Sequence, residues 1–261
     1  MADPVKAATP SDGRRDRWSA HRQQRRAEFV QAALRVLASS GPDLPMDAVA
    51  AEAGVTKPVL YRYFADKAAL VDALADAGSA VLLARLLPAM QSSHLPLERI
   101  REAVGAYFAV IDEQPNLYWL LARWPPAEPG GEAVPAGSTA HPGSMVQQDR
   151  ELIATSLTAI LGDYLRVFGL DSGGAEPWAY GITGLVQSTG EWWLRRRSMS
   201  RVHVVDYVTQ LIWAALSGVL RDAGIVLDPA RPLPPVRPKL TAHATSGTAG
   251  ESGGRADERT G

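Results

Sequence analysis

The side chains in this sequence that are best suited to binding are hydrogen-bond donors gathered between residues 56 and 67. They combine the hydroxyl groups of Thr56, Tyr61 and Tyr63 with the ammonium groups of Lys57 and Lys67. Donors of this kind contact the phosphate oxygens and base edges of DNA. Tyr63, near the inward side of its helix end, and Lys67 suit phosphates. Lys57 and Tyr61 are the better candidates for reading bases.

The sequence lacks the patterns that enzymes and metal sites need. There is no cysteine, and no two of the five histidines are close enough to share a helical turn. A Gly-x-Ser-x-Gly string occurs only at 250–254, in a Gly-rich segment with no strand before it. Clustered aspartates for magnesium and Gly-rich phosphate loops are missing. We therefore expect no enzyme activity, no metal site and no cofactor.

The donors lie on a helix-turn-helix pattern. Gly54 follows an Ala-rich helical stretch at a position that favours a left-handed backbone, and Val55 supplies an apolar plug between two helices. Thr56 is placed to cap the second helix, and Pro58 falls in its first turn, where no N–H is needed. This order of residues predicts two short helices joined by a tight turn.

Apolar spacing separates two faces of the second helix. Leu60 and Phe64, four positions apart, are expected to face the core. Lys57, Pro58 and Tyr61 are left on the opposite side, where an exposed aromatic ring favours a partner that covers it. The second helix is therefore the expected DNA-reading element.

A longer ordered set extends this pattern and comprises Ala50, Ala53, Gly54, Val55, Thr56, Leu60, Tyr61, Tyr63, Phe64, Lys67 and Leu70. In this set, over residues 22–81, the sequence resembles the TetR family of transcriptional regulators. The resemblance implies DNA contacts at Thr56, Lys57, Pro58, Tyr61, Tyr63 and Lys67. One departure is Leu44-Pro45, which replaces the usual Ser or Thr before the first motif helix. Only the backbone amide of Met46 is then left to meet a phosphate.

Charge is distributed unevenly along the chain. Residues 14–67 hold ten Lys and Arg against six Asp and Glu, whereas residues 68–261 hold sixteen against twenty. A basic N-terminal piece on an acidic body favours double-stranded DNA as the partner of the first piece. Arginines cluster before residue 27 and include Arg25, a candidate DNA contact. These arginines either lie along a DNA groove or remain solvated.

Helical periodicity predicts an all-α protein with about nine helices and no clear strand. The expected helices cover residues 22–40, 46–53, 57–64, 66–84, 97–113, 116–124, 145–168, 177–197 and 202–223. The first three form a DNA-binding unit, and Asp66 caps the helix that links it to a larger bundle. We expect a disordered basic arm at 1–21, the helix-turn-helix domain at 22–84, an effector-binding and dimerisation domain at 85–227 with a mobile loop at 125–143, and a disordered tail at 228–261.

Aromatic residues are concentrated in the second domain, where large rings leave gaps between helices or simply fill a core. The residues we expect to line an effector pocket are Tyr107, Trp119, Trp124, Tyr164, Trp178, Tyr180 and Gln187. The family resemblance implies an effector site in this domain. We expect an apolar or amphipathic small molecule.

The last two expected helices carry small and apolar residues at helical spacing. The set is Gly181, Gly184, Leu185, Ser188, Trp192, Val208 and Ile212. Such a face packs either within the monomer or against a second copy. The resemblance implies a homodimer, in which these two helices pair with their symmetry mates.

These features together predict a repressor that leaves a palindromic operator when a small molecule binds. The alternative is a helix-turn-helix regulator controlled by a protein partner. No apolar run of 18 residues and no signal-peptide pattern occur. We therefore expect a cytoplasmic protein without a membrane partner.

Overall fold

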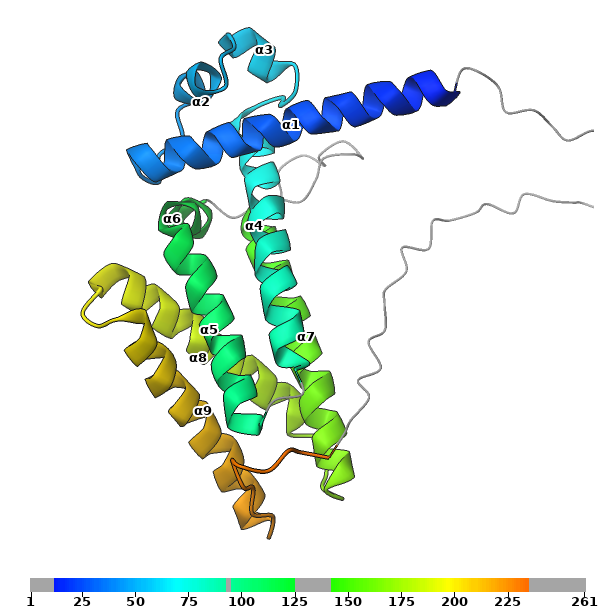
Figure 1. Cartoon of the computed structure of the whole chain (residues 1–261), viewed down its shortest axis with the longest axis vertical. Helices are drawn as coiled ribbons and strands as arrows, with labels where there is room; N and C mark the ends of the chain where they lie inside the picture. The colour runs from blue at the N-terminus through cyan, green and yellow to red at the C-terminus, as the bar shows by residue number, and fades with distance from the viewer. Residues whose placement is uncertain (1–11, 93–94, 125–141, 235–261) are drawn as a thin grey trace, which may run out of the picture.

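The computed structural model describes residues 12–92, 95–124 and 142–234, and in these ranges every regular element is an α-helix. The helices are α1 (Asp12–Ser40), α2 (Met46–Glu52), α3 (Lys57–Tyr61), α4 (Lys67–Met90), α5 (Pro96–Glu113), α6 (Pro115–Arg123), α7 (Pro142–Val167), α8 (Ala175–Arg196) and α9 (Arg201–Asp222). The predicted all-α architecture is confirmed, as are nine helices for these ranges. Figure 1 shows α1–α3 as a cap on the bundle formed by the remaining helices.

The cap has its own apolar core, which the start of α4 completes. Phe29 of α1, Leu60 of α3 and Phe64 just after α3 are almost fully buried in it, together with Leu70 of α4. The inward positions predicted for Leu60 and Phe64 are therefore confirmed. Because these side chains meet inside, the opposite side of α3 is left facing solvent.

Helix α4 connects the cap to the bundle without interruption. The carboxylate of Asp66 accepts a 2.8 Å hydrogen bond from the amide of Ala69, so the predicted cap of this helix is confirmed. The first turns of α4 place Leu70 in the core of the cap, and its last turns place Leu86 and Met90 in the bundle. Between these ends α4 packs along α5 and α7.

Helix α6 lies where the two parts meet. Leu117 and Leu120 are buried against the core of the cap, and Trp124 packs against the same core. The side-chain amide of Asn116 donates a 2.7 Å hydrogen bond to the carbonyl of Leu37 in α1. Contacts through α6 therefore add to the covalent connection through α4.

In the bundle, α5 packs against α9 and α7 against α8. Phe108 of α5 and Trp193 of α8 lie in its core with ring centroids 5.7 Å apart. Gly190 allows a close approach, because a Cβ atom there would lie 2.8 Å from Cε1 of Tyr107. Helix α9 is long and apolar enough to meet a membrane-span criterion, with a third of its most apolar window buried in the fold.

The structure corrects two predicted helix limits. Helix α1 begins at Asp12, so the arm predicted to be disordered over 1–21 is helical from that residue onward. Three of the ten residues from 12 to 21 are arginines, which have high helix propensity, and the helix continues through them. Helix α4 runs to Met90 instead of ending near residue 84, with Pro88 in its last turn.

Two segments predicted to lack structure are described only in part. Residues 125–141 of the predicted loop lie outside the described residues, and the last two residues of that loop, 142 and 143, already belong to α7. Residues 235–261 of the predicted tail also lie outside them. Residues 228–234 are described, and there Asp228 accepts a 2.9 Å hydrogen bond from the amide of Ala230. The tail prediction is wrong for this short stretch, because it folds back onto the bundle.

Candidate nucleic-acid interface and internal cavities

The turn between α2 and α3 has the geometry that the sequence predicts. Gly54 has a φ of +67°, in the left-handed region that favours glycine. The amides of Gly54 and Val55 donate hydrogen bonds to the carbonyls of Ala51 (3.0 Å) and Ala50 (2.9 Å). Val55 packs partly buried against the core of the cap. This closed turn fixes the angle between α2 and α3.

The start of α3 differs from the prediction in one detail. Thr56 occupies the N-cap position with extended backbone (φ −83°, ψ 152°), but its hydroxyl forms no capping hydrogen bond. Pro58 lies in the first turn, as expected. The Thr56 side chain is exposed and its hydroxyl makes no capping bond, so the hydroxyl is available to a partner.

The side chains predicted to meet DNA lie together on the outer face of α3. Thr56, Lys57, Pro58 and Tyr61 are all exposed, Tyr61 to 40%. The ammonium group of Lys57 donates a 3.0 Å hydrogen bond to the carboxylate of Asp47 in α2, and this bond raises the pKa of Lys57. The ion pair orients Lys57 across the turn, beside the other three side chains.

Tyr63 lies at the edge of this face and packs inward, as its spacing predicts. Its ring centroid is 5.1 Å from that of Phe29. The Arg26 guanidinium donates a hydrogen bond to the carbonyl of Tyr63 and lies 4.3 Å from the ring centroid of Phe64. Arg26 thereby holds α1 against the end of α3.

The remaining predicted DNA contacts are more spread out. Lys67 is partly buried, with its ammonium nitrogen 5.9 Å from the ring centroid of Trp124. The side chain of Met46 is buried, so only its backbone can serve a ligand at the start of α2. Arg25 forms a 2.6 Å ion pair with Glu28 in the next turn of α1. Arg25 is therefore not a free cation in this structure.

A recess between α1 and the end of α3 brings Tyr63, a predicted DNA contact, and Arg22 of the N-terminal arginine cluster together with residues that the sequence did not single out. It has a volume of about 290 Å³ and is lined by Trp18, His21, Arg22, Arg62 and Tyr63. We call it the α1–α3 recess. Arg62 directly follows α3 and is exposed. Its place in the sequence next to Tyr61 was the signal that could have identified it as a candidate DNA contact.

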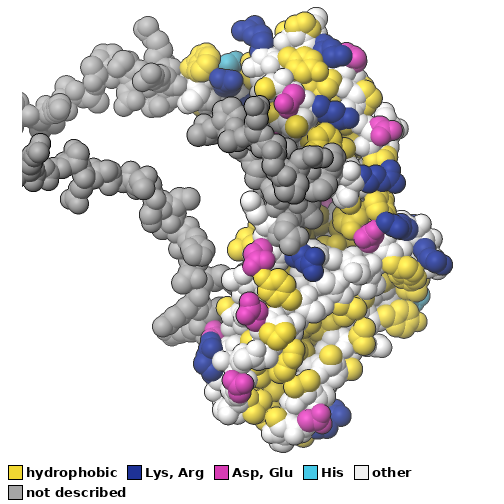
Figure 2. Space-filling view, turned by 180° about the vertical axis from the view of Figure 1, so that it is seen from behind, with side chains coloured by type: hydrophobic (Ala, Val, Ile, Leu, Met, Phe, Trp, Pro, Cys, Tyr) yellow, Lys and Arg dark blue, Asp and Glu magenta, His cyan; other side chains and the backbone are white. Residues whose placement is uncertain are grey.

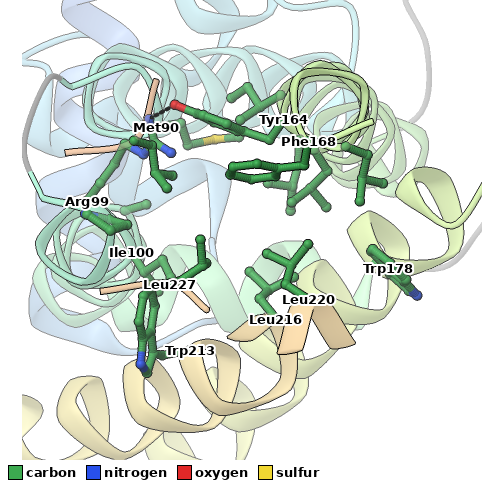
Figure 3. A pocket seen from close by; sticks show the side chains of 17 residues that line it. Met90, Arg99, Ile100, Tyr164, Phe168, Trp178, Trp213, Leu216, Leu220 and Leu227 are labelled. Carbon is green, nitrogen blue, oxygen red and sulfur yellow. Dashed lines mark hydrogen bonds between the residues drawn. The ribbon is translucent and has the colours of Figure 1, made fainter. Parts of the chain in front are cut away.

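Three apolar cavities follow one another through the bundle, with volumes of about 130, 120 and 110 Å³. The distal cavity (Figure 3) lies between α5, α7 and α9 and shares Ile100 and Leu157 with the central cavity. The central cavity shares Tyr107 and Gln187 with the proximal cavity, which reaches α6. The three cavities therefore lie in a row and share walls, and we call this row the cavity path.

Few polar groups line this path. Arg99 is the charged residue of the distal cavity, where it donates a 3.0 Å hydrogen bond to the hydroxyl of Tyr164 (Figure 3). In the central cavity the hydroxyl of Thr183 is buried without a hydrogen-bond partner among the described residues, one turn before Gln187. A buried hydroxyl without a partner is unfavourable, and a polar atom of a ligand would satisfy it.

The proximal cavity has the opposite charge. Ser79 of α4 donates a hydrogen bond to the carboxylate of Asp149 in α7, and both residues line the cavity. Burial raises the pKa of Asp149, and the hydrogen bond from Ser79 only partly offsets this effect. Glu113 also lines this cavity. Because Glu113 is paired with Arg85 at 2.7 Å, the carboxylate of Asp149 is the acidic group that marks this end of the path, and Arg99 marks the distal end.

The structure divides the predicted effector residues into two groups. Tyr107, Tyr164, Trp178 and Gln187 line the cavities, whereas Trp119, Trp124 and Tyr180 line none of the three. Trp119 packs on Tyr118, Trp124 belongs to the core of the cap, and the Tyr180 hydroxyl donates a 2.5 Å bond to Glu151. Aromatic composition alone could not separate these roles. Arg99 and the aliphatic walls were missed, whereas Thr183, which shares a helix face with Gln187, lines the central cavity as a polar residue.

The predicted dimer residues also divide. Gly181, Ser188 and Trp192 are exposed on α8, and Gly184 and Leu185 are partly buried beside them. Val208 and Ile212 are each only 4% exposed and face the core of the bundle, so their assignment to a dimer surface is wrong.

The outer side of α9 instead presents Tyr207, Leu211 and Val219, which are 61%, 55% and 42% exposed. Both sides of α9 are apolar, so its spacing did not reveal which side is buried. Figure 2 shows hydrophobic side chains spread over the lower body, while Lys and Arg are more frequent toward the cap.

Comparison with known proteins covers both parts of the chain. Residues 29–74 match the family of bacterial regulatory proteins described as the tetR family, and residues 85–225 match the tetracyclin repressor-like C-terminal domain. An uncharacterized HTH-type transcriptional regulator of Mycobacterium tuberculosis is 34% identical over 93% of this chain and 98% of its own. The HTH-type transcriptional activator FasR of Mycolicibacterium smegmatis is 25% identical over 80% of this chain and 91% of its own.

Solved structures share the fold. A TetR-family regulator from Streptomyces coelicolor matches with a TM-score of 0.59 and 23% identity, over 77% of this chain and 83% of its own. FadR from Bacillus subtilis, solved with stearoyl-CoA, matches with a TM-score of 0.55 and 16% identity, over 71% of this chain and 96% of its own.

Proposed function

Since the chain belongs to the TetR family of DNA-binding transcriptional regulators, we propose that it is a ligand-responsive repressor. In this proposal two copies bind a palindromic operator, and an amphipathic small molecule that fills the three cavities releases them. Thr56, Lys57, Pro58, Tyr61, Tyr63 and Lys67 contact DNA in each copy. The proposed place of action is the cytoplasm, where the operator is.

One observation carries the proposal: α4 begins beside the DNA-reading face and ends in the cavities. Lys67 is its first residue, while Leu86 and Met90 of its last turns line the central cavity. Ser79 and Leu82, midway along it, line the proximal cavity. A molecule that pushes α4 away from α5 or α7 therefore moves the cap. Such a molecule shifts the DNA-competent population only by its different affinities for the two states.

The cavity walls favour a long amphipathic ligand. They are lined mainly by aliphatic and aromatic side chains, which suits a linear apolar chain. Arg99 at the distal end suits an anionic group, whereas the carboxylate of Asp149 at the proximal end disfavours one. The structural neighbour FadR was solved with stearoyl-CoA, so long-chain acyl compounds are natural members of a test panel.

Pairing of two copies is proposed through α8 and α9. Trp192 of α8 and Tyr207 and Leu211 of α9 are large apolar side chains exposed to solvent, and exposed apolar surfaces mark protein contacts. Gly181 and Ser188 on the same side lack bulky side chains and permit close approach of a second helix. A two-fold pair would present two copies of α3 to half-sites about 34–36 Å apart.

The experiment has two stages. First, operator DNA is selected from a random duplex pool, and its affinity is measured. Second, the affinity is measured again with fatty acids, acyl thioesters and neutral lipophilic compounds of increasing length. Weaker DNA binding with one of these classes supports the proposal. If none of them changes DNA binding, control by a protein partner replaces the effector in the proposal. Tighter DNA binding would replace release by the ligand with recruitment by the ligand.

A further inference from the structure

The α1–α3 recess has the form of an anion site that the recognition helix alone does not provide. We propose that it binds a phosphate of the DNA backbone flanking the bases read by α3. Arg22 and Arg62 would hold the phosphate oxygens, Tyr63 would donate from one side, and Trp18 would cover the adjoining sugar. The inference rests on the proposed function, because operator DNA is the occupant.

The walls of the recess are fixed relative to each other. Arg26 donates to the carbonyl of Tyr63 and lies over the ring of Phe64, while Phe29 packs against the ring of Tyr63. These contacts join α1 to the end of α3 directly below the recess. A preorganised site loses little conformational entropy when its ligand arrives, which favours binding.

The charge of the recess is positive and largely uncompensated. Arg22 and Arg62 are exposed, and neither forms an ion pair with a carboxylate of the described residues. Burial lowers the pKa of Arg26, and the nearby positive charge of Arg22 lowers it further. Lys57, in contrast, already bonds to Asp47. Of these cations, Arg22 and Arg62 are thus the ones left without an anionic partner.

The residue types suit a phosphate better than a base edge. A guanidinium group presents a planar fork of donors that matches phosphate oxygens. The Arg22 guanidinium carbon lies 5.7 Å from the centroid of the Trp18 ring, so the ring helps to orient it. The N-terminal half of α1, which carries Trp18 and Arg22, projects beyond α4 (Figure 1), and the recess joins it to Arg62 at the end of α3. The recess therefore lies beside the groove contacts.

The first test uses charge. Arg22→Gln and Arg62→Gln are compared with Arg166→Gln, which removes an exposed arginine at the far end of α7. Each recess variant should bind operator DNA about threefold to tenfold more weakly, equally for all operator sequences, and lower the salt slope by about one unit. Arg166→Gln should behave as the unmodified protein. All three should keep its melting temperature, because the side chains are exposed.

The second test identifies the ligand atom. Single phosphates of the operator are replaced by neutral methylphosphonates, and each substituted duplex is bound to every variant. A phosphate whose neutralisation weakens the unmodified protein and Arg166→Gln, but has little further effect on Arg22→Gln, is the proposed occupant. The inference is overturned if Arg22→Gln keeps full sensitivity at every phosphate, or if it changes the preference among operator bases. Failure of the unmodified protein to bind any duplex would overturn the proposed function as well.

Discussion

The side-chain amide of Asn116 in α6 lies 2.7 Å from the carbonyl oxygen of Leu37 in α1 and donates a hydrogen bond to it. This contact joins the helix that closes the proximal cavity to the first helix of the DNA-binding cap. Together with the passage of α4 through both parts, it gives the cavities two physical connections to the DNA-reading face.

Breaking the Asn116 contact should weaken the connection without removing either site. Asn116→Ala should lower the free energy of unfolding by about 1 kcal/mol, the usual contribution of one such hydrogen bond. It should also reduce the factor by which a ligand changes operator affinity. Ligand affinity in the absence of DNA should stay within about twofold. Thermal unfolding and paired DNA titrations measure these quantities, and an unchanged coupling factor would mean that α4 alone transmits the signal.

Phosphate contacts should affect all DNA sequences alike. Tyr63→Phe keeps the ring against Phe29 and removes only the hydroxyl, so it should weaken every operator variant by the same factor. Lys67→Gln should additionally lower the salt slope by about one unit. Tyr61→Phe and Lys57→Gln should instead change the order of preference among operators. If the first two variants changed the order of preference and the last two did not, the phosphate-contact and base-reading roles would have to be exchanged.

The surface formed by α8 and α9 should hold the dimer. Leu211→Glu places a charge on the exposed apolar side of α9 and should convert the protein to monomer at micromolar concentration. Val226→Glu alters a side chain that is 79% exposed outside these helices and serves as the control. Light scattering measures the mass of both. A dimeric Leu211→Glu protein would direct the search to another surface.

Filling the cavities should separate ligand response from DNA binding. Ala103 lines both the distal and the central cavity, so Ala103→Phe places a ring in space that is empty in this structure. The variant should bind operator DNA normally and lose its response to ligands. Arg99→Gln should lower affinity for anionic ligands while leaving neutral analogues of the same length unaffected. Equal losses for both classes would remove the assigned role of Arg99.

Asp149 should make stability depend on pH. Because its pKa is raised in the folded state, the folded protein binds this proton more tightly than the unfolded chain does. The fold therefore gains stability as pH falls through the raised pKa toward the pKa of the unfolded chain, and it lacks that contribution at higher pH. Asp149→Asn lacks this contribution, so its stability relative to the unmodified protein should be greatest near neutral pH and decrease on acidification. Urea titrations at several pH values measure the difference.

The parts of the fold that were predictable depend on local sequence. The turn at Gly54 and the inward positions of Leu60 and Phe64 follow from backbone conformation and helical spacing, which neighbouring residues determine. The positions of Val208 and Ile212 do not, because both sides of α9 are apolar and only packing against α5 decides between them. Trp124 was misassigned for a similar reason, since docking of α6 on the cap depends on residues far away in the sequence.

The α1–α3 recess also depends on contacts between residues that are distant in the sequence. Trp18 and Arg22 precede Arg62 by about forty positions, so their proximity follows only from the crossing of α1 and α3. The early start of α1 compounded the omission, because arginine-rich sequence was interpreted as a disordered arm although it continues the helix.

The central claim is that ligand in the cavities and DNA at α3 influence each other, and reciprocal titration tests it most directly. Operator affinity is measured with and without saturating ligand, and ligand affinity with and without saturating operator. The affinity for operator and the affinity for ligand should fall by the same factor, with about 1.4 kcal/mol of coupling for each tenfold change. Ala103→Phe should abolish both of these decreases. A ligand that binds in the cavities and leaves operator affinity unchanged would contradict the central claim.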